Sequence, residues 1–192
     1  MLFTRNNGRH GNKQSNSTIP SKNKNIKKMT QNVKPPVSPP ERKVYWGAPT
    51  WIFFHTIAHK IKDEKFLQLK SALLKFIYQI CSYLPCPICT EHAKAYLKNV
   101  NFNNITTKTA LKHMLFEFHN NVNKRKNYDN FDINKLNSTY ENVNLVNSIN
   151  RFINVYKVSF LSPTNISFTT HRKEVISEFT TWFKENIHCF EP

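Results

Sequence analysis

The strongest constraint on the fold is a helical spacing of apolar residues in the part of the chain after residue 44. Between residues 64 and 84, apolar side chains recur every three or four positions, at Phe66, Leu69, Leu73, Phe76, Ile77, Ile80 and Leu84. A second such stripe runs through Leu111, Met114, Leu115, Phe118 and Val122. Only three glycines occur in 192 residues, so tight turns are scarce. We therefore predict a mainly α fold.

Four helices are expected, over about 49–62, 64–83, 86–98 and 107–126, and they would form a four-helix bundle within 44–128. Thr50 or Ala48 is the expected N-cap of the first helix, and Thr106 or Thr107 that of the fourth. Residues 129–192 form a C-terminal extension, partly helical, with an extra short helix. In it, 143–160 suits a helix or a strand, and 171–187 carries a helical stripe. The stripe must be buried, either on the bundle or against a partner.

Residues 1–43 have the composition of a disordered basic arm that ends in a proline-rich linker. The formal charge of the chain is +16, and a large share of that excess lies before Val44. We interpret the arm as a solvated tail and do not expect nucleic acid as a partner. No apolar run is long enough to span a membrane, and the N-terminus lacks the apolar region of a secretory signal peptide.

A Cys-x-x-Cys motif, Cys86 to Cys89, stands between two helical segments. Pro85 disfavours helix before it and Pro87 suits a first helical position, so a helix is expected to begin near Cys86. Thiols at a helix N-terminus are stabilised as thiolates, which favours redox chemistry. Helical steps from Cys89 bring His92, Ala93 and Tyr96 onto its face.

The motif alone leaves alternatives open. Cys86, Cys89 and His92 would suit a zinc ion with Cys81 or Cys189 as fourth ligand, although no second half-site is present at a typical spacing. A thioredoxin-like site requires a preceding strand, and the flanks are predicted helical. Two ordinary buried thiols are the simplest alternative. We predict no metal site.

Imidazoles and a tryptophan stand at helical spacing before and after the motif. Trp51, His55 and His59 follow one face of the first helix, and His119 and Asn123 lie one turn apart on the fourth. Taken singly, such residues are more often packing residues or ordinary polar helix ends than ligand contacts.

The order of these segments along the chain indicates a protein family more specifically than any single segment does. Trp46-Gly-x-x-Thr-Trp51 with His55, then Pro85-Cys86-x-x-Cys89-x-x-His92, then His119-Asn120-x-Val122-Asn123 resembles the flavin-dependent sulfhydryl oxidases of the Erv/Alr family. The match spans about 80 residues. It implies a bundle that holds FAD and oxidises protein dithiols.

The resemblance also implies roles for individual residues. Cys86 would exchange with the incoming dithiol, and Cys89 would be the thiol nearest the flavin. The implied flavin contacts are Trp51, His55, His92, His119, Asn120, Val122 and Asn123. Basic residues often meet flavin phosphates, and Lys124, Arg125 and Lys126 are candidates. Phe116 stands where many members have a further cysteine, so that disulfide is expected to be absent.

Partners and compartment follow from the same resemblance. We expect protein dithiols or a thioredoxin-like relay protein as substrate, O2 as acceptor with release of H2O2, and a homodimer. The family and the Asn/Lys-rich composition favour a large DNA virus, with the protein in the infected host cytoplasm or the virion. The mitochondrial intermembrane space is the alternative. The competing function is a zinc-stabilised nucleic-acid-binding module that uses the basic arm; a catalytically inactive scaffold with the same fold is a third.

Overall fold

The computed structural model describes residues 45–158 and 166–192, and these contain seven α-helices and no β-strand. The predicted basic arm, 1–43, lies outside the described residues. The elements are α1 (Gly47–Lys60), η1 (Asp63–Lys65), α2 (Phe66–Ser82), α3 (Pro87–Lys98), η2 (Phe102–Asn104), α4 (Lys108–Arg125), η3 (Ile133–Lys135), α5 (Leu136–Tyr140), α6 (Leu145–Val158), α7 (Ile166–Asn186) and η4 (Ile187–Cys189). The mainly α prediction is confirmed.

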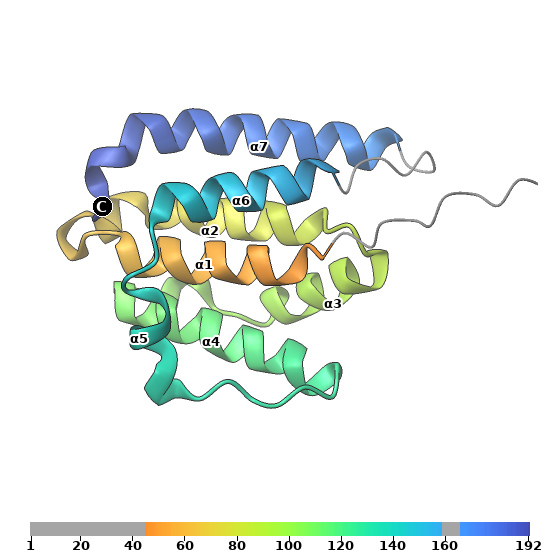
Figure 1. Ribbon diagram of the computed structural model, residues 1–192, viewed down its shortest axis with the longest axis horizontal. Coiled ribbons are helices and arrows are strands. Elements are labelled where there is room, and N and C mark those ends of the chain that lie inside the picture. Colours follow the sequence, from red (N-terminus) through yellow and green to blue (C-terminus); the bar gives the residue numbers. More distant parts are fainter. Residues whose placement is uncertain (1–44, 159–165) are drawn as a thin grey trace, which may run out of the picture. The chain divides into compact units, whose positions relative to one another are not determined.

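The helices pack as three layers (Figure 1), with α1 and α2 in the middle. On one side α4 packs on α1 and α3 on α2, and on the other side α6 packs on α1 and α7 on α2. The short α5 also contacts α1. One hydrophobic core joins all three layers, because its buried side chains come from the six long helices.

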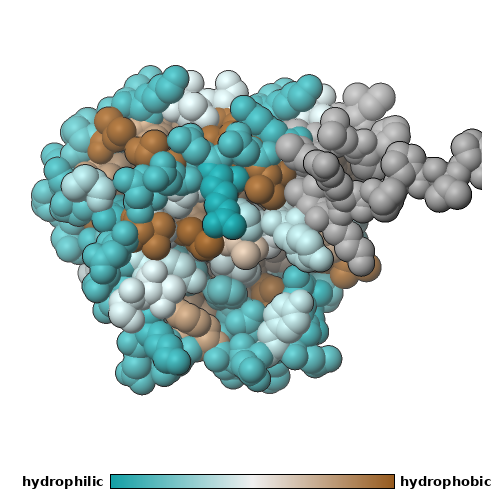
Figure 2. Space-filling view, in the orientation of Figure 1, coloured by the Kyte–Doolittle hydropathy of each residue, from teal (hydrophilic) through white to brown (hydrophobic). Residues whose placement is uncertain are grey.

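The C-terminal extension packs on the bundle, which answers the question that its apolar stripe left open. Phe53 of α1 stacks on Phe152 of α6, with ring centroids 4.5 Å apart, and meets Phe179 of α7 edge-on at 5.2 Å. All three rings are buried. Residues 145–158 are helical and not a strand. In Figure 2 mostly hydrophilic residues cover the visible face, with small hydrophobic patches between them.

Two helix starts show how local sequence sets the boundaries. Thr107 caps α4 as predicted, since its side chain accepts a hydrogen bond from the Ala110 N–H. The predicted cap of α1 is wrong, because the helix already begins at Gly47. Thr50 lies inside the helix, where its hydroxyl donates to the Trp46 carbonyl at 2.8 Å. No described helix is both long and apolar enough to cross a membrane.

Candidate functional site

The Cys-x-x-Cys motif lies at the start of α3, as its flanking prolines predicted. Cys86 is the N-cap residue, Pro87 is the first residue of the helix, and the Cys86 Sγ accepts a hydrogen bond from the Cys89 N–H at 3.2 Å. The two cysteines form a disulfide with their Cα atoms 5.1 Å apart. Both are half-buried. The motif is therefore oxidised, at a helix N-terminus where the macrodipole favours thiolates on reduction.

Two adjoining cavities are lined by residues of α1 and α4, and the smaller one is also lined by residues of α3 and of the C-terminal end of α2. The larger has a volume of about 460 Å³, within the range of small-molecule sites, and the smaller about 40 Å³. They share the lining residues Trp46, Gly47, Trp51, Val122 and Lys126. Cys89 lines the smaller cavity, and Cys86 lines neither. The second cysteine of the motif therefore opens on this space, and the first lies outside it.

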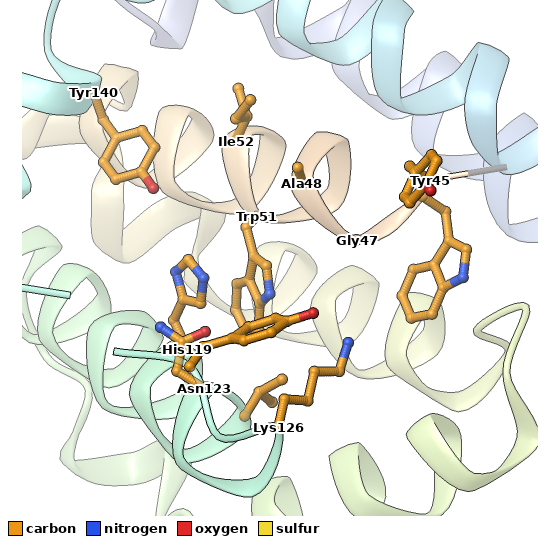
Figure 3. A pocket seen from close by; sticks show the side chains of 12 residues that line it. Tyr45, Gly47, Ala48, Trp51, Ile52, His119, Asn123, Lys126 and Tyr140 are labelled. Carbon is orange, nitrogen blue, oxygen red and sulfur yellow. The ribbon is translucent and has the colours of Figure 1, made fainter. Parts of the chain in front are cut away.

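A stacked pair of rings forms one wall of the larger cavity. Trp51 of α1 and His119 of α4 lie nearly parallel, with centroids 4.1 Å apart and planes at 11°. Figure 3 shows the two rings side by side, with Asn123 and Lys126 near them. Gly47 lines both cavities, and a Cβ atom there would meet no atom within 4 Å. The site offers flat rings and open space beside a few polar groups.

His55 lies behind this wall and is fully buried. Its Nε2 is 3.1 Å from Nδ1 of His119, and its ring stacks on Tyr140 with centroids 4.4 Å apart. Burial lowers the pKa of His55 from 6.5 to about 3, and the neighbouring His119 and His59 act in the same direction. Burial also lowers the pKa of His119, to about 4. Both imidazoles are therefore neutral at pH 7, and one N–H can be shared between them.

The end of α4 shapes the open side of the larger cavity. Asn127 adopts a left-handed conformation, with φ 56°, and ends the helix in a Schellman motif. In this motif the Tyr128 N–H donates to the Asn123 carbonyl at 2.9 Å. The chain thus turns back, and Tyr128 joins Lys126 in lining the larger cavity.

The structure brings together most of the residues that the sequence singled out. Trp51, His119, Val122 and Asn123 line the larger cavity, and Cys89 and Ala93 line the smaller one. Lys126 borders both and Arg125 the smaller, whereas Lys124 is exposed and borders neither.

Three predicted flavin contacts lie outside the cavity walls. His55 is one layer behind, as described above. Asn120 has its amide committed to the backbone of Phe131, accepting from the N–H at 2.7 Å and donating to the carbonyl at 3.0 Å. His92 is exposed. The buried residues of α3 are Thr90, Ala93 and Leu97, so His92 lies outside the buried face of the helix.

Tyr140 is a residue of the site that sequence reasoning missed. Tyr140 lines the larger cavity and stacks on His55 from α5, which belongs to the segment assigned to the extension. It packs with Phe116 and Leu136 in a second small core. Phe116 thus contributes an apolar contact at the position where the resemblance implied a missing cysteine. A lone aromatic in an Asn-rich segment gave no pattern by which to find it.

The structure also bears on the two remaining cysteines and on the alternative of a zinc site. Cys81 and Cys189 are free and buried, so they do not pair with each other. Within 45–158 and 166–192, no three His, Cys, Asp or Glu side chains are grouped to hold a metal ion. Cys86 and Cys89 share their sulfurs in a disulfide and His92 faces outward, so the three proposed zinc ligands are not arranged as a site.

Comparison with known proteins points to one family. The Erv1/Alr family model matches residues 48–141. The chain is 32% identical over 84 residues to the FAD-linked sulfhydryl oxidase of African swine fever virus, which covers 44% of this chain and 70% of that protein. Proteins 347L of invertebrate iridescent virus 6 and 096R of invertebrate iridescent virus 3, provisionally named as the same oxidase, are 30% and 31% identical over 86 and 83 residues. These matches cover 42% and 43% of this chain, and 78% and 56% of the two proteins. No solved structure matches significantly.

Proposed function

Because this chain belongs to the Erv1/Alr family, we propose that it is an FAD-linked sulfhydryl oxidase that forms disulfides in protein dithiols. The main structural support is the position of the disulfide beside the cavity. The Cys86–Cys89 disulfide caps a helix whose second cysteine opens on an aromatic-lined cavity, so a dithiol acceptor adjoins a space for a flat cofactor.

The cavity residues fit a flavin. Trp51 and His119 present flat apolar surface, Gly47 leaves space where a side chain would project, and Lys126 offers a cation for phosphate. Behind the Trp51–His119 wall, the buried Nδ1 of His55 has no hydrogen-bond partner among the described residues. When bound, FAD supplies a two-electron acceptor that can pass its electrons to O2, with H2O2 as product.

The chain's own cysteines carry out the thiol chemistry. A substrate thiolate attacks Sγ of Cys86, the Cys86–Cys89 bond breaks, and a mixed disulfide forms while Cys89 leaves as a thiolate. The helix N-terminus stabilises that leaving thiolate. The second substrate thiolate then attacks the substrate sulfur of the mixed disulfide and releases Cys86. The substrate is now a disulfide, and the two electrons reside on the reduced Cys86 and Cys89.

The proposal extends to partners and compartment. Protein dithiols, or a thioredoxin-like relay protein, would be the substrates, with O2 as terminal acceptor. The viral origin of the relatives supports a role in the infected host cytoplasm or the virion, where glutathione otherwise keeps thiols reduced. The mitochondrial intermembrane space is the alternative compartment, and the homodimer stays a prediction.

The test is the visible absorption spectrum of the purified protein, taken before and after dithiothreitol is added under air. We expect a flavin spectrum that bleaches with thiol and recovers as oxygen is consumed, with H2O2 accumulating in step. A colourless protein with one bound zinc per chain would overturn the proposal. A bound flavin that dithiothreitol does not reduce would contradict the assigned role of Cys86 and Cys89.

A further inference from the structure

Arg172 of α7 reaches the loop that leads into the redox motif. Its Nε donates to the Tyr83 carbonyl at 2.6 Å, and its Nη2 donates to the Leu84 carbonyl at 2.8 Å. The side chain is buried, with 7% of the residue exposed. A buried guanidinium with two short hydrogen bonds to neighbouring carbonyls fixes both peptide groups at once.

Tyr156 of α6 holds the same loop from the neighbouring helix. Its hydroxyl is 2.8 Å from the Tyr83 carbonyl and 3.3 Å from the Ile80 carbonyl. The Tyr83 carbonyl lies just beyond the C-terminal end of α2, whereas the Ile80 carbonyl lies in its last turn and also accepts from the Tyr83 N–H at 3.2 Å. The rings of His171 and Phe168 of α7 also pack on Tyr83, at centroid distances of 5.0 and 5.8 Å.

Hydrogen bonds also connect this loop to the first turn of α3. The Leu84 carbonyl that Arg172 binds also accepts a hydrogen bond from the Thr90 hydroxyl at 3.4 Å, and the Thr90 N–H donates to the Cys86 carbonyl at 3.0 Å. Only Pro85 separates Leu84 from Cys86. Arg172 therefore binds a carbonyl two residues before Cys86, and the same carbonyl binds Thr90, the residue after Cys89.

We infer that Arg172 is a positioning residue for the redox pair, and that the C-terminal extension, which lies beyond the residues matched by the family model, is a working part of the redox site. By fixing the Tyr83–Pro85 loop, Arg172 holds Cys86 against Cys89 and favours the closed disulfide over the open dithiol. The inference rests on the proposed function only in taking Cys86–Cys89 as the redox pair. Preorganisation of this kind changes the equilibrium between the two states of the pair.

The test measures that equilibrium directly in the full-length holoprotein. Wild type and Arg172→Gln are equilibrated anaerobically in glutathione redox buffers, quenched by acid and alkylation, and the fraction of Cys86–Cys89 disulfide is determined by mass spectrometry. We expect Arg172→Gln to make the disulfide about tenfold less stable, because the change removes charge-assisted hydrogen bonds from the loop before Cys86. Lys173→Gln, an exposed neighbour on α7, is the matched control and should leave the equilibrium unchanged.

A merely structural role would lower the melting temperature of Arg172→Gln and leave the disulfide equilibrium of the folded protein at its wild-type value, and this result would overturn the inference. If Arg172→Gln does not fold, Tyr156→Phe decides the matter, because it removes one donor and keeps the buried ring. A twofold to threefold shift toward the dithiol, about half a kcal/mol, supports the inference, and no shift overturns it. Turnover of dithiothreitol by the wild type tests the proposed function separately.

Discussion

The two faces of α1 are built from different kinds of side chain. Toward α4, Trp51 stacks on His119, and His55 shares a hydrogen bond with the same ring. Toward α6 and α7, Phe53 packs between Phe152 and Phe179 with no polar group among the three rings. The first face lies beside cavities, and the second is closed core. One helix thus borders the cavities on one side and the closed apolar core on the other.

On the cavity side of α1, the largest expected effect is on turnover and comes from a change in the redox pair. Cys89→Ser removes the thiol that opens on the cavity, so turnover of dithiothreitol should fall by at least about a thousandfold. The flavin absorbance should remain, because the aromatic wall is intact. Oxygen uptake and visible spectra measure the two effects. Cys189→Ala is the control, and a comparable loss of turnover there would mean that the buried Cys189 takes part as a shuttle.

The largest effect on stability is expected on the opposite face. Phe179→Ala deletes a ring that is fully buried against Phe53 and Phe76, and should lower the free energy of unfolding by about 3–5 kcal/mol. Urea unfolding followed by circular dichroism measures it, with the exposed Leu67→Ala as control, expected to change stability by less than about 0.5 kcal/mol. Equal effects of the two changes would show that the extension is not part of the core.

The two faces of α1 should also differ in how they respond to pH. On the α4 face, His55 is buried and its ring lies within hydrogen-bond distance of His119. The pKa values of His55 and His119 in the folded state are about 3 and about 4, below the unfolded value of 6.5. The unfolded chain therefore binds more protons as pH falls below 6.5, and stability is lost from there down to the folded values. Each such group contributes a slope of up to about 1.4 kcal/mol per pH unit.

Unfolding at several pH values between 7 and 4 tests this slope. His55→Asn should reduce the pH dependence, because it removes the fully buried imidazole whose pKa is lowered. An unchanged slope in His55→Asn would show that the buried pair does not set the acid sensitivity.

The smallest expected effect concerns the charged rim of the cavity. Lys126 lines both cavities but is exposed, so its interaction with a flavin phosphate is screened by water and salt. Lys126→Gln should weaken FAD binding about threefold at low salt, or about 0.7 kcal/mol, and less at high salt. Fluorescence titration of the flavin-free protein measures it. The same change at Lys124, which borders neither cavity, should have no effect.

Helix positions and the setting of the redox motif were predictable because their causes are local. Pro85 and Pro87 fix where α3 begins, and Thr107 caps α4, so both starts follow from neighbouring residues. The apolar stripe of α7 was likewise evident. The exposure of His92 could not be predicted, because counting from Cys89 gives a face but not how much of that face the core covers.

The sequence by itself thus determined the helical class, the order of the helices, the place of Cys86 and Cys89 at a helix start, and the family resemblance. Only the tertiary structure decided that His55 meets His119, that Tyr140 stacks on His55, and that Arg172 binds the loop before the disulfide. The physical reason is distance along the chain. Propensity, capping and periodicity act within a few residues, whereas these contacts join segments 64 to 89 residues apart and depend on how the layers pack.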